Sequence, residues 1–304
     1  MGDVQGRNNV LNKAQKYTID DFNREFPDDA ACLDYLMEAR FPGHVATCET
    51  CGVERKHYRI NGRKVYSCDH CGTQISPLAG TIFEKSSTPL RLWFHAMFQM
   101  GSTKCGISAK QIQRETGVTY KTAWRMFKQI RTLMSEDLQL EGEAVEMDET
   151  YFGGRIRGRG RGPKLENKTP IVGVVERNGR GRAIALATPN LKKETIIGIA
   201  RERILPKSLV YTDESWRYDG MKAAGYEHRR IHHASRVYVM GDIHTNTIEG
   251  FWSLIKRGIG GTHHSVSQKF LQEYLNEYSF RYNRRNVPQP MFKQILDQVS
   301  ERAE

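Results

Sequence analysis

Long hydrophobic runs are missing from this chain of 304 residues, of which 38% are hydrophobic. A helix that crosses a bilayer needs about 20 consecutive apolar residues, and no stretch of the sequence approaches that length. The opening segment, residues 1–14, is polar and lacks the apolar core of a secretory signal. We therefore expect a cytoplasmic protein of about two or three packed domains, without a membrane span.

Acidic residues are in deficit. Lys and Arg number 46 against 35 Asp and Glu, so the net charge is +11 and the pI is near 9.4. This balance indicates a polyanionic partner, most commonly nucleic acid. Cations interleaved with glycines crowd one stretch: Arg155, Arg157, Arg159, Arg161, Lys164 and Lys168. We expect a mobile arm that folds onto phosphates; a solvated loop without a partner is the alternative.

Cysteines are few, and their spacing argues against disulfides. Two of the six, Cys32 and Cys105, are isolated. The other four form two C-x-x-C pairs: Cys48 and Cys51, then Cys68 and Cys71. Two such turns supply four thiolates at tetrahedral corners, and the loop between them contains Asn61-Gly62, a hairpin signal. The pattern predicts a zinc ribbon whose closed, four-ligand site is structural rather than catalytic.

A helical region flanks this ribbon. Residues 17–42 predict a helical lead-in, and residues 88–98 predict a buried helix with a polar cap and a proline in its first turn. Next, Ser108 can cap a helix over residues 109–115, residues 116–118 form a turn, and Thr119 can cap a second helix that runs to about Met134.

This pattern is typical of a helix-turn-helix. Its inward face comprises Ile112, Val118, Ala123, Trp124, Phe127 and Ile130. The outer face of the second helix would meet the major groove of DNA with Tyr120, Lys121, Arg125, Lys128 and Arg131. An ordinary helical hairpin is the alternative.

From residue 143 the pattern becomes alternating strands and helices. Strands are predicted over residues 144–152, 170–175, 183–187, 208–213 and 228–232. Helices are predicted over residues 195–204 and 216–224, and a long helical region begins near Thr245. The fold class is therefore α/β, with a sheet of mixed direction.

Acidic residues punctuate these apolar segments. Asp148 lies within the first strand and Asp213 ends the fourth, where an unpaired carboxylate is costly without a cation. Glu249 and Lys256, seven residues apart, share one face of the last helix. Three carboxylates around one crevice can hold two magnesium ions on a scissile phosphate. Alternation along strands assigns the neighbouring Glu149 at most a supporting role, and the same holds for Glu214.

Three strings carry a resemblance to a known family: residues 147–154 (MDETYFGG), 211–215 (YTDES) and 246–258 (NTIEGFWSLIKRG). Together with residues 282–285 (YNRR), and in the right order over about residues 30–286, they resemble the DDE-type, ISXO2-like transposases of bacterial insertion sequences, which carry an N-terminal zinc ribbon. The resemblance implies a ribonuclease-H-like catalytic domain and dependence on magnesium or manganese. By position it makes Asp148 and Asp213 metal ligands.

The third acidic position has two candidates. Some relatives carry asparagine there, which would be Asn246; the spacing to Lys256 favours Glu249. The implied reaction is hydrolysis at the element end, followed by attack of the freed 3′-hydroxyl on target DNA. Lys256 and Arg257 would steady DNA phosphates.

The resemblance also implies an organisation. The predicted segments are a lead-in and ribbon (17–80), a helix-turn-helix region (81–140), a catalytic domain (141–290) and a helical tail (291–304). The ribbon and the helix-turn-helix would bind the terminal inverted repeats, and the arginine-glycine stretch would contact the DNA backbone of repeats or target. Cleavage of two ends implies a homodimer or larger assembly on DNA, working at the nucleoid.

Three other functions compete. A DNA-binding regulator would explain the ribbon and the charge but not the acids. A nuclease of the same fold would hydrolyse DNA without joining strands. A tyrosine recombinase, suggested by residues 281–284 (RYNR), would form a covalent phosphotyrosine and have no use for the acids.

Overall fold

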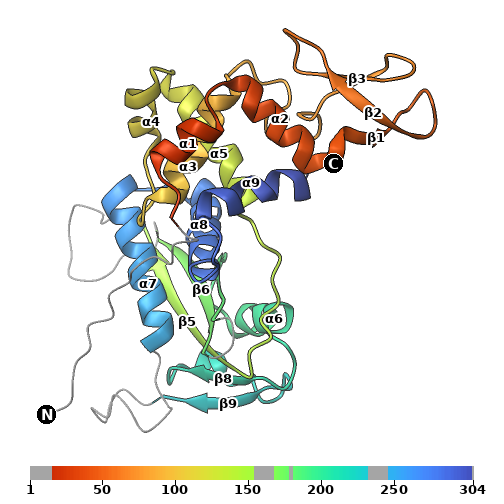
Figure 1. The fold of residues 1–304 in the computed structure, drawn as a ribbon. Coiled ribbons are helices and arrows are strands. Elements are labelled where there is room, and N and C mark those ends of the chain that lie inside the picture. The colour runs from red at the N-terminus through yellow and green to blue at the C-terminus, as the bar shows by residue number, and fades with distance from the viewer. Residues whose placement is uncertain (1–15, 154–167, 178–180, 232–245, 303–304) are drawn as a thin grey trace, which may run out of the picture. The chain divides into compact units, whose positions relative to one another are not determined.

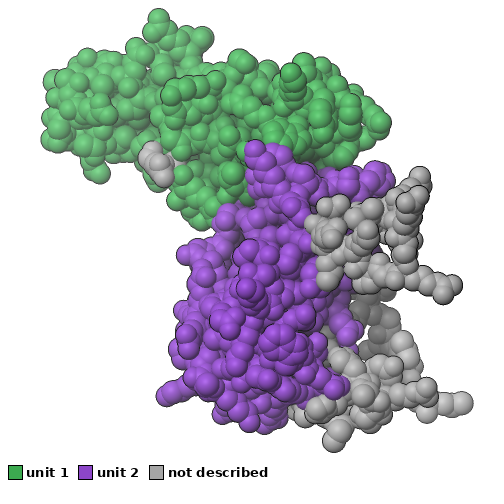
Figure 2. All heavy atoms as spheres, turned by 180° about the vertical axis from the view of Figure 1, so that it is seen from behind, with its two compact units in different colours: residues 1–133, 286–304 green, residues 134–285 purple. Residues whose placement is uncertain are grey.

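The computed structural model describes residues 16–153, 168–177, 181–231 and 246–302 (Figure 1). The chain divides into two compact units, which Figure 2 colours separately. Unit 1 comprises residues 1–133 and 286–304, and unit 2 comprises residues 134–285. The C-terminal helix α9 (Met291–Glu301) therefore belongs with the N-terminal residues.

Unit 1 begins with two short helices, as predicted for residues 17–42. Helix α1 (Ile19–Glu25) starts at a capping box, in which Thr18 and Asp21 each satisfy the other's backbone N–H. Helix α2 (Asp29–Arg40) is capped by Asp28, whose side chain accepts from the N–H of Ala31.

A four-stranded antiparallel sheet follows a 3₁₀ turn, η2 (Pro42–His44). Its strands run in the order β1 (Val45–Thr47), β2 (Glu54–Arg59), β3 (Tyr66–Cys68) and β4 (Gln74–Ile75). The predicted hairpin at Asn61-Gly62 is confirmed: Gly62 has a φ of +74°, which glycine adopts at little cost. Asp34 of α2 fixes the sheet by accepting hydrogen bonds from Arg59 and Tyr66.

Helices complete unit 1: α3 (Leu90–Ser102), α4 (Ala109–Thr116) and α5 (Tyr120–Leu133), with α9 packed on α3. Phe292 of α9 is 2% exposed and lies among five other aromatic rings. These are Tyr17, Phe22, Phe26, Phe94 and Phe98. Helix α3 starts one residue after Pro89, without the predicted polar cap.

Unit 2 is built on a five-stranded sheet in the order β7-β6-β5-β8-β9. The strands are β5 (Ala144–Phe152), β6 (Thr169–Glu176), β7 (Ala183–Ala187), β8 (Leu209–Thr212) and β9 (Glu227–Arg230). β5 to β7 are antiparallel neighbours, whereas β8 and β9 run parallel to β5. The predicted α/β fold with a mixed sheet is confirmed.

Each face of this sheet has its own apolar core. Helix α6 (Lys193–Arg203) covers one face with Ile196, Ile199 and Ala200. Helices α7 (Asn246–Gly258) and α8 (Leu271–Asn283) cover the other, and Figure 1 shows α7 running along β5. Between α7 and α8 lie a π turn, η6 (Ile259–His263), and a 3₁₀ turn, η7 (Gln268–Phe270), which break the long helical region expected from residue 245.

One predicted element of unit 2 is wrong. The helix expected over residues 216–224 is only a 3₁₀ turn, η4 (Trp216–Tyr218), followed by further turns up to Gly225. Glycines at positions 220 and 225 disfavour helix, and the side chain of Tyr218 turns inward to bond Glu149. None of the described helices is long and apolar enough to cross a membrane.

Candidate zinc ribbon and acidic site

The four paired cysteines converge. Cys48 and Cys71 have Sγ atoms 3.4 Å apart, and those of Cys51 and Cys68 are 3.9 Å apart. Among the described residues, this is the one group of three or more Cys, His, Asp or Glu whose ligand atoms all lie within 4.8 Å of one another.

Each cysteine pair sits in the same kind of turn. The N–H of Gly52 donates to the carbonyl of Cys48, and the N–H of Gly72 donates to that of Cys68. Both glycines have φ between +70° and +80°, a conformation that other residues rarely adopt. Sulfurs bound to one zinc at about 2.3 Å lie about 3.8 Å apart at tetrahedral corners, so the four thiols fit a structural zinc ion.

The pairing of two parallel strands brings the predicted aspartates near each other. Glu146 of β5 pairs with Tyr211 of β8. Asp148 stands two residues after Glu146 within β5, and Asp213 stands two residues after Tyr211, one residue past the end of β8. Alternation along β5 points Asp148 toward the face covered by α7.

Asp148 is surrounded by α7 and by the neighbouring acids. The indole Nε1 of Trp252 donates to its Oδ2 at 2.9 Å. Burial raises the pKa of Asp148 to about 6, and repulsion from Glu149 and Asp213 adds to this, against the hydrogen bonds from Trp252 and the backbone. A divalent cation would offset this repulsion, and carboxylate oxygens are the donors that magnesium and manganese prefer.

A missing side chain makes room for that indole. Gly173 of β6 lies opposite Asp148 in the sheet, and a Cβ there would come within 2.5 Å of the Trp252 ring. Gly173 interrupts an apolar run, Ile171-Val172-Gly173-Val174-Val175, and an isolated glycine in a strand signals close approach of another group. The sequence therefore indicated close packing at position 173, but not that Trp252 is the group that packs there.

Glu146 is a functional candidate that the sequence reasoning missed. It is fully buried, pairs with Arg177 at 2.8 Å, and accepts a hydrogen bond from the N–H of Ile248 at 2.8 Å. The last contact satisfies a free donor in the first turn of α7 and places a negative charge at its positive end. Glu146 thus binds the first turn of α7 to β5, at a position two residues before Asp148.

The third acid lies beside this contact. Glu249 is exposed and stands one turn before Trp252, so Glu249, Trp252 and Lys256 form one stripe along α7. Asn246 is also exposed but lies about 160° from the buried Ile248 around the helix. Asp148, Asp213 and Glu249 do not lie within 4.8 Å of one another as a group of ligand atoms.

Glu149 points to the opposite face of the sheet. It accepts hydrogen bonds from Arg217 at 2.7 Å and from the buried Tyr218. This is the separation expected from alternation along the strand. Asp213 accepts a hydrogen bond at 2.9 Å from the N–H of Ser215, which begins the turn containing these partners.

Sequence profiles of known families match both regions. The profile of a transposase zinc-ribbon domain matches residues 27–74, and that of an ISXO2-like transposase domain matches residues 139–283. The chain therefore combines a transposase zinc ribbon with an ISXO2-like transposase domain. The second match spans β5 to the end of α8 and so includes all three acids.

Two relatives agree with the family. A protein in transposable element ISH50 of Halobacterium salinarum is 29% identical over 300 residues, covering 92% of this chain and 98% of the relative. A transposase-like protein of Haemophilus influenzae is 27% identical over 106 residues, covering 35% of this chain and 85% of the relative.

The helical region of this transposase forms the two predicted helices and the turn between them. Ser108 caps α4, Gly117 ends it in the left-handed conformation with a φ of +72°, and Thr119 accepts from the N–H of Thr122 at the start of α5. Tyr120, Lys121 and Arg125 are exposed.

Arg131 was placed wrongly on the outer face. It is 3% exposed, with its guanidinium 5.5 Å from the centre of the Phe127 ring. Lys128 is half-buried, with its Nζ 5.9 Å from the Trp124 ring centre. Arg131 follows the buried Ile130 and stands one turn after Phe127, at the edge of the apolar stripe, where a long side chain can bury its stem.

The arginine-glycine stretch cannot be compared with its prediction, since Arg155, Arg157, Arg159, Arg161 and Lys164 lie outside the described residues. Arg257 lies in the last turn of α7, is exposed, and donates to the carbonyl of Ser253.

The RYNR string holds helix and sheet together. Arg281 pairs with the buried Glu277, and the side-chain amide of Asn283 bonds both the N–H and the carbonyl of Ala183 on edge strand β7. Gln272 likewise bonds Ala185 and Ala187. These contacts give the string a structural use and leave the tyrosine-recombinase alternative without a supporting observation.

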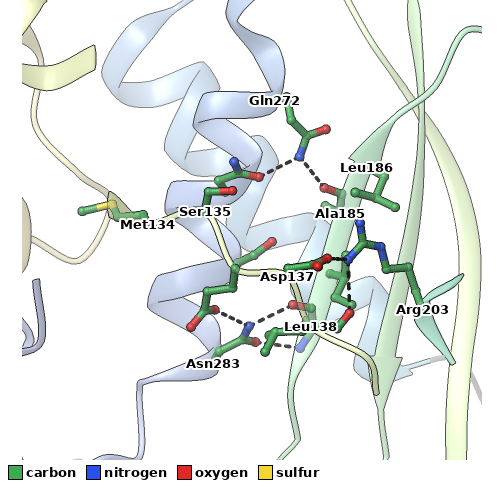
Figure 3. Close-up of a pocket in the computed structure, with 14 residues that line it drawn as sticks. Met134, Ser135, Asp137, Leu138, Ala185, Leu186, Arg203, Gln272 and Asn283 are labelled. Atoms are coloured by element: carbon green, nitrogen blue, oxygen red, sulfur yellow. Dashed lines mark hydrogen bonds and ion pairs between the residues drawn. The ribbon is translucent and has the colours of Figure 1, made fainter. Parts of the chain in front are cut away.

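A cavity of about 360 Å³ lies beside the same edge strand (Figure 3). It is lined by β7, by α8, by residues 134–138 and by Arg203 at the end of α6. Because β6 separates β7 from β5, this cavity is distinct from the acidic site.

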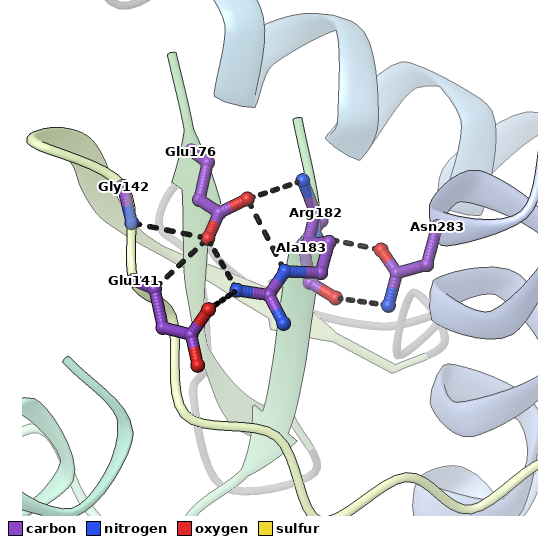
Figure 4. A network of polar contacts seen from close by, with 6 residues as sticks. All are labelled: Glu141, Gly142, Glu176, Arg182, Ala183 and Asn283. Carbon is purple, nitrogen blue, oxygen red and sulfur yellow. Dashed lines mark hydrogen bonds and ion pairs between the residues drawn. The ribbon is translucent and has the colours of Figure 1, made fainter. Parts of the chain in front are cut away.

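A buried ion pair lies at the C-terminal end of β6 (Figure 4). Glu176 is 2% exposed and accepts from Arg182 and from the backbone N–H groups of Glu141, Gly142 and Arg182. Burial acts to raise the pKa of Glu176, but these hydrogen bonds outweigh it and hold that pKa below its usual value of 4.5.

Proposed function

We propose that this transposase binds the ends of an insertion sequence and catalyses metal-dependent cleavage and strand transfer. The observation that supports the proposal is the parallel pairing of β5 and β8, two residues before Asp148 and Asp213, together with the electrostatic interaction between these two acids. The sheet order, with three antiparallel strands followed by two parallel ones, supports a ribonuclease-H-like assignment for unit 2.

Asp148 and Asp213 would hold magnesium or manganese. Two such ions, when bound, activate the attacking oxygen and stabilise the leaving one. Glu249 is the better third ligand because it adjoins Trp252, whereas Asn246 lies farther around the helix. Movement of the exposed Glu249 side chain on DNA binding would complete the site. Lys256, on the same stripe, would meet a phosphate along the bound strand.

Other parts of the chain would bind the DNA. The zinc ribbon and the α4–α5 helix-turn-helix would recognise the terminal repeats, with Tyr120, Lys121, Arg125 and Lys128 facing the duplex. Arg257 and the arginines of the glycine-rich stretch would contribute salt-dependent contacts to the backbone. Processing of two ends calls for at least two copies on DNA.

Strand cleavage by purified full-length protein tests this proposal. Duplexes taken from the DNA flanking the gene are incubated with Mg²⁺, and separate precleaved duplexes are offered with target DNA to detect joining. We expect nicking and joining by the wild type, and neither by Asp148→Asn or Asp213→Asn, with end binding nearly intact. We also expect Glu249→Gln to be inactive and Asn246→Ala to retain part of the activity.

The outcomes separate the alternatives. A regulator would bind the ends without nicking, and a nuclease without transferase activity would nick but never join. Loss of end binding by the aspartate variants would make these acids structural and refute the assignment.

A further inference from the structure

Trp216 is the most exposed large apolar side chain among the described residues, with 65% of its surface accessible. A tryptophan offers a large apolar surface whose burial is favourable, so such exposure at a defined place marks a surface that meets a partner. Its position is informative because it lies three residues after Asp213.

The turn that carries Trp216 is bound at one end to Asp213 and at the other to Glu149, on the opposite face of the sheet from Asp148. Before it, the N–H of Ser215 donates to the carboxylate of Asp213, and the hydroxyl of Ser215 caps η4. After it, Arg217 and Tyr218 both bond Glu149, the residue next to Asp148.

The two aromatic rings of η4 differ sharply in exposure. Tyr218 is fully buried against the sheet, while Trp216 faces solvent. The backbone between them is closed by hydrogen bonds from Tyr218 to Ser215 and from Asp219 to Trp216. The exposed indole of Trp216 is therefore carried by a turn whose backbone is fixed by hydrogen bonds.

The distance suits a nucleotide near the reacting phosphate. Three residues span at most about 11 Å, and bases along one strand of duplex DNA are about 3.4 Å apart. A ring mounted on Trp216 thus reaches bases within about three nucleotides of a phosphate held at Asp148 and Asp213. An aromatic face accepts any unstacked base.

We propose that Trp216 is a stacking platform for a base displaced from the duplex beside the cleaved phosphate. The proposal rests on the function proposed above, since it needs DNA at the acidic site. Stacking on Trp216 would hold the opened strand in place, as proteins do when they take a base out of the helix. The ring would bind DNA and position it, without taking part in the chemical step.

Fluorescence of 2-aminopurine tests this directly. The probes are a set of duplexes from the flanking DNA. Each duplex carries one 2-aminopurine, at one of the first three nucleotides on either side of the cleaved phosphate. It is bound to Asp148→Asn protein, which should cut nothing. With tryptophan at position 216, we expect the fluorescence of 2-aminopurine to be quenched at one of these positions. Trp216→Phe should retain part of this quenching. Trp216→Leu should give higher fluorescence at that position, because leucine cannot stack on a base.

Cleavage in the otherwise wild-type protein provides the second readout. Trp216→Leu should lower the cleavage rate about tenfold to a hundredfold, the effect of one stacked base, while end binding and thermal stability change little. Trp216→Phe should retain most of the rate.

Two results would overturn the proposal. One is that no position responds to the identity of residue 216. The other is that leucine serves as well as tryptophan, which would make this surface an apolar contact between proteins. Cleavage by Asp148→Asn would instead refute the proposed function, and the fluorescence result would still report whether a base stacks on Trp216.

Discussion

At the residue scale, the acidic site depends on side chains that touch the acids as much as on the acids themselves. Asp148 is half-buried, lies near another carboxylate, and accepts a hydrogen bond from one indole N–H. Trp252 fits there only because position 173 has no side chain. Orientation of a ligand by a neighbouring donor is a general property of metal sites.

Trp252→Phe should weaken the response to metal. The variant keeps an aromatic ring but loses the donor to Asp148, so we expect about a tenfold loss of cleavage at limiting Mg²⁺, the value of one hydrogen bond to a charged group. The measurement is a Mg²⁺ titration of the cleavage rate. Partial recovery at high Mg²⁺ would fit a positioning role, and an unaltered titration would exclude it.

Glu176→Gln should destabilise unit 2 in a pH-dependent way. The folded protein lowers the pKa of Glu176, so its stabilisation is complete above the unfolded pKa, near 4.5, and is lost as the pH falls through the lower folded pKa. At pH 7 we expect a loss of about 1–3 kcal/mol in the free energy of unfolding, measured by urea denaturation.

A matched control stands beside it. Glu141 pairs with the same Arg182, but its side chain is 68% exposed, so Glu141→Gln should cost about 0–1 kcal/mol. The effect of Glu176→Gln should shrink toward zero below the folded pKa. An equal effect at both pH values would contradict the charge-based explanation.

At the scale of elements, the sequence predicted what depends on local pattern. The strand at residues 144–152 was placed correctly, as was the Asn61-Gly62 hairpin, because period-two alternation and turn residues are local signals. The α4–α5 turn was found through Ser108, Gly117 and Thr119, which act on their own helix ends.

Contacts between distant segments were not predictable in this way. Trp252 and Asp148 are 104 residues apart, and Glu146 and Ile248 are 102 apart. Only the pairing of β5 with β8, and the seating of α7 on β5, bring such residues together. The prediction for Arg131 was wrong for a related reason. A long basic side chain at the edge of the apolar stripe of a helix is buried or exposed according to what packs against that edge. The metal and DNA-binding roles of the site residues stay predictions.

Removal of zinc should unfold the ribbon. Four thiols on two hairpins have little apolar core to replace the metal, and the binding energy of such sites is largely folding energy. Cys51→Ser should lose zinc and at least tenfold in end binding, measured by metal analysis and fluorescence anisotropy. The control is Cys105→Ser, which removes an exposed thiol outside the cluster. Full end binding by Cys51→Ser would remove the ribbon from end recognition.

At the scale of the whole molecule, the two compact units have separate cores, and the chain leaves unit 1 at residue 133 and returns to it at residue 286. Unit 1 therefore needs the C-terminal helix for its aromatic cluster. Unit 2 encloses both faces of its sheet within residues 134–285.

Phe292→Ala should consequently destabilise unit 1. Truncation of a buried phenylalanine costs about 3–5 kcal/mol, and the five rings around it would lose a common partner. Hydrogen exchange should show faster opening of α1 to α3, with β5, β6 and β8 still protected. Equal loss of protection in both units would contradict the independence of their cores.

The measurement that tests the central claim most directly is the metal requirement of Asp213→Cys in the cleavage assay. A thiolate is a poor ligand for hard Mg²⁺ and a better one for Mn²⁺. If the carboxylate of Asp213 only supported the fold, exchanging Mg²⁺ for Mn²⁺ would not restore cleavage to the cysteine variant. The account predicts almost no cleavage with Mg²⁺ and partial recovery with Mn²⁺. Cleavage by Asp213→Cys with Mg²⁺ at the wild-type rate would contradict this account, because Asp213 would then not be a metal ligand.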